Sequence, residues 1–261
     1  MIFSIWKYRK FIWESAARDL RYRYAGSSIG FLWNVINPLF QIMIYTIVFS
    51  QLMVIRIPNL PSGFGFAIYL CSGLIPWFGF SETVSRCTNS FVENANYLRK
   101  LAIPEQVFVA QNAGSSFFSL MIGMVLLVTI CFFLGHYPAW SWISLPLVLI
   151  LLQGFGFGLG LLFGVLNAFF RDIGQVVNLF LQLWFWATPI VYTENILPES
   201  LKSWLFFNPA YPFIHSLQAI IVDQVWPAGN MWAAMILLAF VFPLLGYLLL
   251  RKLRPELRDV L

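Results

Sequence analysis

Six long apolar segments, separated by polar breaks, dominate the pattern along this chain of 261 residues. They cover residues 31–55, 66–92, 107–134, 143–169, 173–193 and 231–250. A helix that crosses a bilayer needs roughly 20 consecutive, mostly apolar residues, and each segment reaches about that length. The pattern therefore predicts an all-α integral membrane protein with six transmembrane helices, organised as one membrane domain over residues 1–261.

The segment before the first span, residues 1–30, mixes aromatic and aliphatic residues with basic ones. Phe3, Trp6, Lys10, Trp13 and Ala17 recur every three or four residues. This spacing predicts an N-terminal amphipathic helix that lies at the inner membrane surface. A basic leader that serves only to set the topology is the alternative.

Residues 194–229 form the longest connection between two spans. Pro198, Pro209, Pro212 and Pro227 divide it into apolar runs that are too short to cross a bilayer. We expect these runs to form short re-entrant helices on the external side. A cap lying flat on the surface fits the sequence equally well. Residues 230–261 would hold the last span and a basic tail.

Basic residues concentrate in every second break of the pattern. They are Lys7, Arg9, Lys10, Arg18, Arg21 and Arg23 near the N-terminus, Arg99, Lys100 and Arg171 in two breaks, and Arg251, Lys252, Arg254 and Arg258 in the tail. The alternate connections contain only Arg56 and Lys202. Cytoplasmic loops carry an excess of such residues, so both termini are predicted to be cytoplasmic. No basic face lies outside these flanks, which argues against a nucleic-acid partner.

Charged residues interrupt the second apolar segment. Glu82, Arg86, Asn89 and Glu93 fall on one face of the predicted helix. A charge within a membrane is costly unless it is paired or faces water. Glu82 and Arg86 are four residues apart and placed to form an intramembrane ion pair. Contact with a transported substrate and a dimer interface are the alternatives for this face.

The fifth segment combines amides with aromatic rings. Gln175, Asn178, Gln182 and Phe185 share one face, and Trp184, Trp186 and Tyr192 cluster towards the predicted outer end. Amides donate and accept hydrogen bonds to hydroxyl groups, and rings offer flat apolar surfaces. The combination suits the lining of a channel for a sugar polymer. An aromatic belt at the membrane interface is the alternative for the tryptophans and the tyrosine.

The fourth segment contains a ridge of glycines, and the chain offers little catalytic chemistry. Gly156, Gly160 and Gly164 predict close packing against a neighbouring helix. None of the five lysines follows a glycine, so the nucleotide-binding P-loop motif is absent. Cys71, Cys87 and Cys131 lie in apolar segments without metal-binding spacing, and His136 and His215 are isolated. We expect buried cysteines, surface histidines, no metal, no cofactor bound by this chain and no enzymatic activity of its own.

Several stretches together resemble one known family. They are RDLRYRYAGSSIGFLWNVINPLF at 18–40, GLIPWFGFSETV at 73–84, NANYLRKLAIPEQVF at 94–108, NAFFRDIGQVVNLFLQLWFWATPIVY at 167–192 and NPAYPF at 208–213. In this order and spacing, the chain resembles the transmembrane permease of ABC-2 type polysaccharide exporters. That family includes O-antigen exporters and their capsule and teichoic-acid relatives.

The resemblance implies a function and an assembly. The chain would be the channel-forming permease that moves lipid-linked O-antigen polysaccharide from the cytoplasm across the bacterial inner membrane. Capsular polysaccharide or teichoic acid is the alternative cargo, and a drug or small-lipid exporter is a further one. The permease would form a homodimer and bind two copies of a separate ABC ATPase subunit, which would hold the ATP and the magnesium.

The resemblance also implies roles for short segments. The break around residues 97–104 would be the coupling helix that contacts the ATPase, with Tyr97, Leu98, Arg99, Lys100, Ile103 and Pro104 as its contact residues. A gate segment would lie near residues 18–30, and the short helices around residues 197–214 would form the outer gate. Arg18, Arg21 and Arg23 are placed to attract the diphosphate of a lipid carrier, with plain topogenic charge as the alternative.

Overall fold

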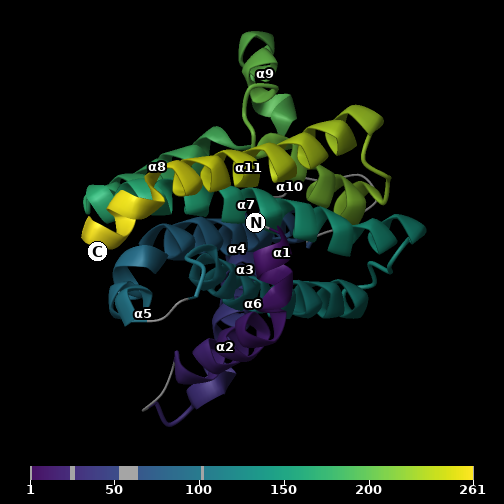
Figure 1. Ribbon diagram of the computed structural model, residues 1–261. Coiled ribbons are helices and arrows are strands. Elements are labelled where there is room, and N and C mark those ends of the chain that lie inside the picture. Colours follow the sequence, from purple (N-terminus) through teal and green to yellow (C-terminus); the bar gives the residue numbers. More distant parts are fainter. Residues whose placement is uncertain (1, 24–26, 53–63, 101–102, 261) are drawn as a thin grey trace.

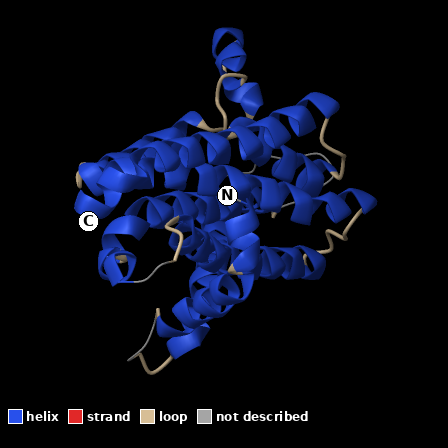
Figure 2. Cartoon of the chain, in the orientation of Figure 1, coloured by secondary structure: helices blue, strands red, loops and turns tan. Residues whose placement is uncertain are grey.

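In a computed structural model of the chain, described for residues 2–23, 27–52, 64–100 and 103–260, every regular element is helical (Figure 2). The elements are α1 (Ile2–Lys7), α2 (Arg9–Tyr22), η1 (Gly30–Leu32), α3 (Trp33–Leu52), α4 (Gly65–Glu93), α5 (Ala95–Lys100), α6 (Gln106–Phe133), η2 (Trp140–Ser144), α7 (Leu145–Phe169), α8 (Ile173–Ala187), η3 (Glu194–Ile196), α9 (Glu199–Leu205), α10 (Tyr211–Gln218), η4 (Ala219–Asp223) and α11 (Gly229–Val260). The all-α class predicted from the apolar pattern is confirmed for these residues.

The helix α7 lies at the centre of the bundle (Figure 1). It packs most extensively against α11 and α4, while α4 packs in turn against α6. The helix α3 contacts α4 and α6, and α8 contacts α4 and α7. The N-terminal helix α2 crosses α6 on the outside of the bundle. The long helices therefore enclose a core to which α4 and α7 contribute most.

Glycines on two faces of α7 explain this close packing. Gly156, Gly160 and Gly164 face α4, where an added Cβ would crowd Phe80 or Cys87. The small-residue ridge predicted from the sequence is thus confirmed. Gly158 points to the other side, where an added Cβ would overlap the backbone of α11. The absence of side chains lets both neighbours approach α7 closely.

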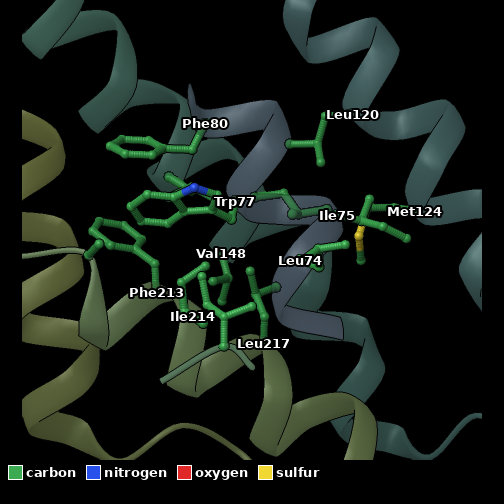
Figure 3. Close-up of a cluster of buried hydrophobic side chains, with 14 of the residues drawn as sticks. Leu74, Ile75, Trp77, Phe80, Leu120, Met124, Val148, Phe213, Ile214 and Leu217 are labelled. Carbon is green, nitrogen blue, oxygen red and sulfur yellow. The ribbon is translucent and has the colours of Figure 1, made fainter. Parts of the chain in front are cut away.

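Aromatic and aliphatic side chains of α4 meet those of α10 in the core (Figure 3). Trp77 and Phe80 are almost fully buried, with their ring centroids 5.6 Å apart. Phe213 of α10 is fully buried and stacks on Phe155 of α7 at 5.5 Å. This cluster joins α10 to α4 and α7, so this short helix belongs to the core and is not a surface cap.

Three helices of the described chain are long and apolar enough to cross a bilayer. They are Gln106–Phe133, Trp140–Phe169 and Gly229–Leu257. The apolar helices Trp33–Val48 and Ile173–Ala187 are shorter, and α4, with 29 residues, contains Glu82 and Arg86. The structure therefore supports a multi-pass membrane protein, while the count of six spans stays a prediction.

Two expectations about element ends and burial were wrong. The helix α8 stops at Ala187 and does not continue to residue 193, because Thr188 is extended before Pro189. His136 is only 4% exposed and its ring contacts the carbonyl oxygen of Ile221, so it is a core residue that ties the α6–η2 connection to η4. The predicted gate segment near residues 18–30 lies partly outside the described residues, and most of the connection that contains Arg56 lies outside them.

Candidate functional site

The break between α4 and α6 forms the short helix α5 at one end of the bundle (Figure 1). Leu98 is 3% exposed and packs in a core cluster with Phe108 and Leu257. Arg99 and Lys100 are exposed. Tyr97 is 58% exposed and lies over Phe108, with ring centroids 6.5 Å apart. Leu98 thus anchors the helix, while its neighbours present two cations and a ring to the outside.

The segment after α5 is tied to the end of α11. Residues 101–102 are not described, and Ile103 and Pro104 are half-buried. Glu105 is 1% exposed and forms an ion pair with Arg254, whose Nε lies 3.0 Å from its Oε2. Five further exposed cations belong to α5, to the turn before α8 and to the same part of α11: Arg99, Lys100, Arg171, Arg251 and Lys252.

A groove of about 380 Å³ separates α5 from the N-terminal helix α2. Its walls include Phe11, Arg18 and Tyr22 from α2, Tyr97 from α5 and Gln111 from α6. The structure thus brings together two segments that are far apart in sequence and that the sequence had assigned separately to a gate and to a coupling helix. A protein segment that contacted α5 here would also contact α2.

Four charged residues behind this groove form a compact network. Arg86 of α4 lies 2.7 Å from Asp19 of α2, and Arg23 lies 2.7 Å from Glu82 of α4. The remaining contacts, Arg23 with Asp19 and Arg86 with Glu82, measure 3.5 and 3.6 Å. The four side chains are only 24–29% exposed. Two positive and two negative charges therefore alternate within one site that joins α2 to α4.

Hydroxyl and amide groups of α6 complete the network. The Ser115 hydroxyl donates to Asp19, and Arg86 donates to Ser115 and to the Asn112 side-chain oxygen. Burial alone would raise the pKa of Asp19. The hydrogen bonds from Ser115 and Arg86, with the nearby positive charges, outweigh that effect and hold the pKa below its ordinary value. The Asp19 carboxylate is thus ionised at neutral pH.

On its other side, the network borders a polar cavity of about 190 Å³. Arg23 and Glu82 line it together with Asn34, Asn37 and Gln41 of α3. Amide side chains of the first predicted span therefore lie beside the charged residues of the second. The polar positions that the sequence scattered over two spans form one continuous polar region.

The three arginines considered for lipid-carrier binding differ in their surroundings. Arg23 donates to Ser115 and Ser119 in addition to its ion pairs, so its guanidinium is occupied within the protein. Arg18 donates to Ser15 and borders the groove next to α5. Arg21 is exposed. Arg18 and Arg21 are therefore better placed than Arg23 to meet an external anion.

The residues considered for channel lining divide into two groups. Gln175, Asn178, Gln182 and Trp186 are exposed on α8, which buries only Gly174, Val177, Leu181 and Trp184. Phe185 is half-buried, 5.9 Å from Trp77. The amides thus lie on an open face of the isolated chain, while Trp184 and Phe185 turn towards the core.

Asn208 and Asp19 each bond to several other residues, and neither was identified from the sequence. Asn208 accepts from the Trp184 indole at 2.7 Å and donates to the Ala187 carbonyl at 3.2 Å. No sequence pattern predicts the bond between Trp184 and Asn208, because the two residues lie on either side of the connection that follows α8. For Asp19 a signal existed, since it precedes Arg23, the residue that caps α2, by four positions.

Comparison with known proteins places this architecture in a family. The ABC-2 type transporter family matches residues 11–222. The chain is 29% identical over 245 residues to an O-antigen export system permease protein RfbA of Klebsiella pneumoniae, covering 94% of this chain and 92% of that one. It is 28% identical to the protein of the same name from Myxococcus xanthus, over 87% of this chain and 86% of that one.

A more distant relative belongs to another transport system. The polysialic acid transport protein KpsM of Escherichia coli is 22% identical over 193 residues, which are 74% of this chain and 73% of that one. The family match extends from α2 to η4 and so includes the charge network, α5 and α8. The family similarity, together with the apolar helices of the bundle, shows that the chain belongs to the ABC-2 type transporter family of membrane proteins.

Proposed function

We propose that the chain is the permease subunit of an ATP-driven exporter that moves lipid-linked O-antigen polysaccharide from the cytoplasm across the bacterial inner membrane. The observation that carries this proposal is the similarity to two O-antigen permeases over 94% and 87% of the chain. The weaker similarity to a polysialic acid transport protein supports capsular polysaccharide as the alternative cargo. The energy would come from a separate ATPase subunit, which would hold ATP and magnesium.

The proposed assembly contains two copies of this chain and two ATPase subunits. The ATPase would dock at α5, where Tyr97, Arg99 and Lys100 are exposed and Leu98 is the buried anchor. Exposed cations at this end support its cytoplasmic placement, since cytoplasmic loops carry excess positive charge. Both termini would then be cytoplasmic.

The charge network would transmit movements of the docking site to the membrane domain. A movement imposed on α5 passes directly to α4, because Asn94 alone separates the two helices. The ion pairs of Asp19 and Arg23 with α4 would make α2 move with it. Packed helices and ion-pair networks with discrete arrangements are the elements that carry such coupling.

The exposed face of α8 is the proposed wall of the polysaccharide channel. Gln175, Asn178 and Gln182 present donors and acceptors there, and Trp186 adds an exposed ring. Many weak contacts of this kind would let a polymer bind and leave again, as conduction requires. Arg18 and Arg21 would attract the carrier diphosphate at the cytoplasmic side.

The proposal is tested by co-purifying the chain with a candidate ABC ATPase subunit and measuring ATP hydrolysis in proteoliposomes. We expect hydrolysis to rise when a lipid-linked polysaccharide is added. The double variant Arg99→Gln with Lys100→Gln should lose most of this response, because it removes two exposed charges from the docking helix.

The matched control is Lys202→Gln, which removes a cation from α9, on the opposite side of the proposed membrane. It should leave ATPase binding unchanged. Failure of the chain to bind any ABC ATPase would refute the exporter proposal. Binding with a response to lipid-linked capsular polysaccharide but not to O-antigen would assign the alternative cargo.

A further inference from the structure

An apolar pocket of about 800 Å³ lies between the bundle and the short helix α9. Its walls come from α7 with Phe155, Leu159 and Phe163, from α11 with Phe242, and from α9 with Trp204. Figure 1 shows α9 projecting away from the other helices, across the direction of α7 and α11. Trp204 is 71% exposed, so this wall is accessible from outside the bundle. The volume falls within the range of roughly 300–1,000 Å³ that ligand pockets occupy.

Two walls of the pocket, those of α7 and α11, lie deep in the membrane. Phe155 and Leu159 lie near the middle of the span Trp140–Phe169. Phe242 lies near the middle of the span Gly229–Leu257. Residues halfway along a membrane-spanning helix lie at the depth of the hydrocarbon core. The α7 and α11 walls therefore face hydrocarbon and not the lipid head groups, while α9 forms the outer end of the pocket.

The polar groups in the wall have little capacity left for a ligand. The Asn208 side chain accepts from the Trp184 indole and the Ala210 amide and donates to Ala187 and Thr188. These four bonds use both donors and both acceptor positions of an amide. The Tyr192 hydroxyl donates to the Trp186 carbonyl at 3.1 Å. A sugar needs many free donors and acceptors, and the wall offers only the Tyr192 hydroxyl oxygen and the Trp204 indole beside its apolar residues, whereas a hydrocarbon chain needs none.

We infer that this pocket binds the acyl chain of a bilayer phospholipid, with the end of the chain inserted between α7, α8 and α9. Bilayer lipids are the most abundant hydrocarbon at this depth, and an empty pocket would forfeit dispersion contacts. The exposed rings of Trp204 on α9 and of Phe206 and Phe207 just after it would rest on the same lipid. Trp184 would then stiffen the wall of a lipid site and not line the polysaccharide path. The inference rests on membrane insertion and does not depend on the identity of the cargo.

The test is photo-crosslinking of the purified full chain in vesicles of phosphatidylethanolamine and phosphatidylglycerol. A trace of phosphatidylethanolamine carries a diazirine near the methyl end of one acyl chain. We expect mass spectrometry to find more adducts on Phe163 and Phe242 than on Leu237, which is 62% exposed on α11 outside the pocket. Moving the diazirine next to the head group should remove this enrichment.

A variant that fills the pocket provides the second arm of the test. Ala187→Trp adds a large ring at an exposed position of the pocket wall, and Ala233→Trp makes the same change at an exposed position of α11 that does not line the pocket. We expect the first variant to lose most of the adducts on Phe163 and Phe242 and the second to keep them. Neither substitution removes atoms from the hydrophobic core, so both variants should fold.

Three results would overturn the inference. The first is wild-type labelling no higher on Phe163 and Phe242 than on Leu237, as expected if a second copy of the chain fills the pocket. The second is labelling that Ala187→Trp leaves unchanged. The third is displacement of the phospholipid probe by a trace of polyprenyl phosphate, which would assign the pocket to an isoprenoid tail instead.

Discussion

Individual charged residues explain how this chain tolerates charge close to the membrane. An isolated charge within a bilayer costs several kcal/mol. Asp19, Arg23, Glu82 and Arg86 avoid this cost because each lies within 4 Å of two residues of opposite sign. The sequence placed Glu82 beside Arg86, but the shorter contacts of both residues are with α2. Pairing within one helix is therefore the weaker part of the network.

The substitution Arg86→Gln should loosen α2 from the bundle. It removes the 2.7 Å partner of the Asp19 carboxylate, which keeps Ser115 and the longer contact with Arg23, and losing a hydrogen bond to a charged group costs about 1.5–3 kcal/mol. The measurement is the rate of limited tryptic cleavage at the exposed residues Arg18 and Arg21 in detergent micelles. We expect this rate to increase.

The control for this prediction is Glu14→Gln. Its partner Lys10 lies 3.9 Å away and is 88% exposed, so the exposed pair should contribute less than about 1 kcal/mol. Cleavage of this variant should match that of the wild type. Equal cleavage rates for Arg86→Gln and Glu14→Gln would show that the charge network does not hold α2.

At the scale of single elements, the close packing of α7 depends on glycines, which have no side chain. Gly156, Gly160 and Gly164 create space for α4 on one face, and Gly158 creates space for α11 on another. The sequence revealed the first face through its four-residue spacing. The second face was not recognised from the sequence, although Gly154 and Gly158 are also four residues apart. The need for glycine at position 158 becomes clear only from the position of Pro243 on α11, whose backbone an added Cβ would overlap.

The substitution Gly158→Ala should destabilise the bundle more than Gly154→Ala. A Cβ at Gly158 overlaps the backbone of Pro243, and overpacking of this kind costs about 1–3 kcal/mol. A Cβ at Gly154 meets only ordinary contacts, the nearest at 3.6 Å, so that variant should be neutral or slightly stabilised. Both glycines face α11, which makes them a matched pair.

Thermal unfolding followed with a thiol-reactive dye measures this difference. Cys71, Cys87 and Cys131 are buried, so the dye reacts only when the helices separate. The unfolding temperature should fall for Gly158→Ala and stay close to wild type for Gly154→Ala. A decrease of the same size for both variants would contradict the role assigned to Gly158.

At the scale of the whole molecule, the fold joins segments from both halves of the chain. The helix α10 packs between α4, α7 and α11, and α2 packs on α6. The groove between α2 and α5 and the pocket below α9 both arise from this arrangement. Neither could be predicted from the sequence, since their walls come from residues separated by several helices.

The proposed topology predicts opposite accessibility for two introduced cysteines. Asn96→Cys lies on α5 and Ser200→Cys on α9, both at exposed positions. In intact cells, a membrane-impermeant maleimide should label Ser200→Cys, whereas Asn96→Cys should react only after the inner membrane is opened. The buried native cysteines should stay unlabelled in both cases. Labelling of Asn96→Cys from outside would reverse the orientation and contradict docking of an ATPase at α5.

Much of the architecture could be predicted because it depends on local composition. Long apolar runs indicated a helical membrane protein, since only helices satisfy the backbone within a single spanning segment of this kind. The break at Arg99 and Lys100 stood out because charge is rare in this chain. The end of α8 was predicted too late, although Pro189 marks it, because the apolar pattern continues past Thr188.

By itself, the sequence determined the class of the protein, the approximate positions of its spans and the segment proposed to meet an ATPase. These properties follow from hydrophobicity, charge and proline placement, which act over a few neighbouring residues. The tertiary structure decided which charges pair, which face of α8 is open and where a lipid chain could insert. These properties depend on side chains that meet across helices, and no short stretch of sequence contains both partners of such a contact.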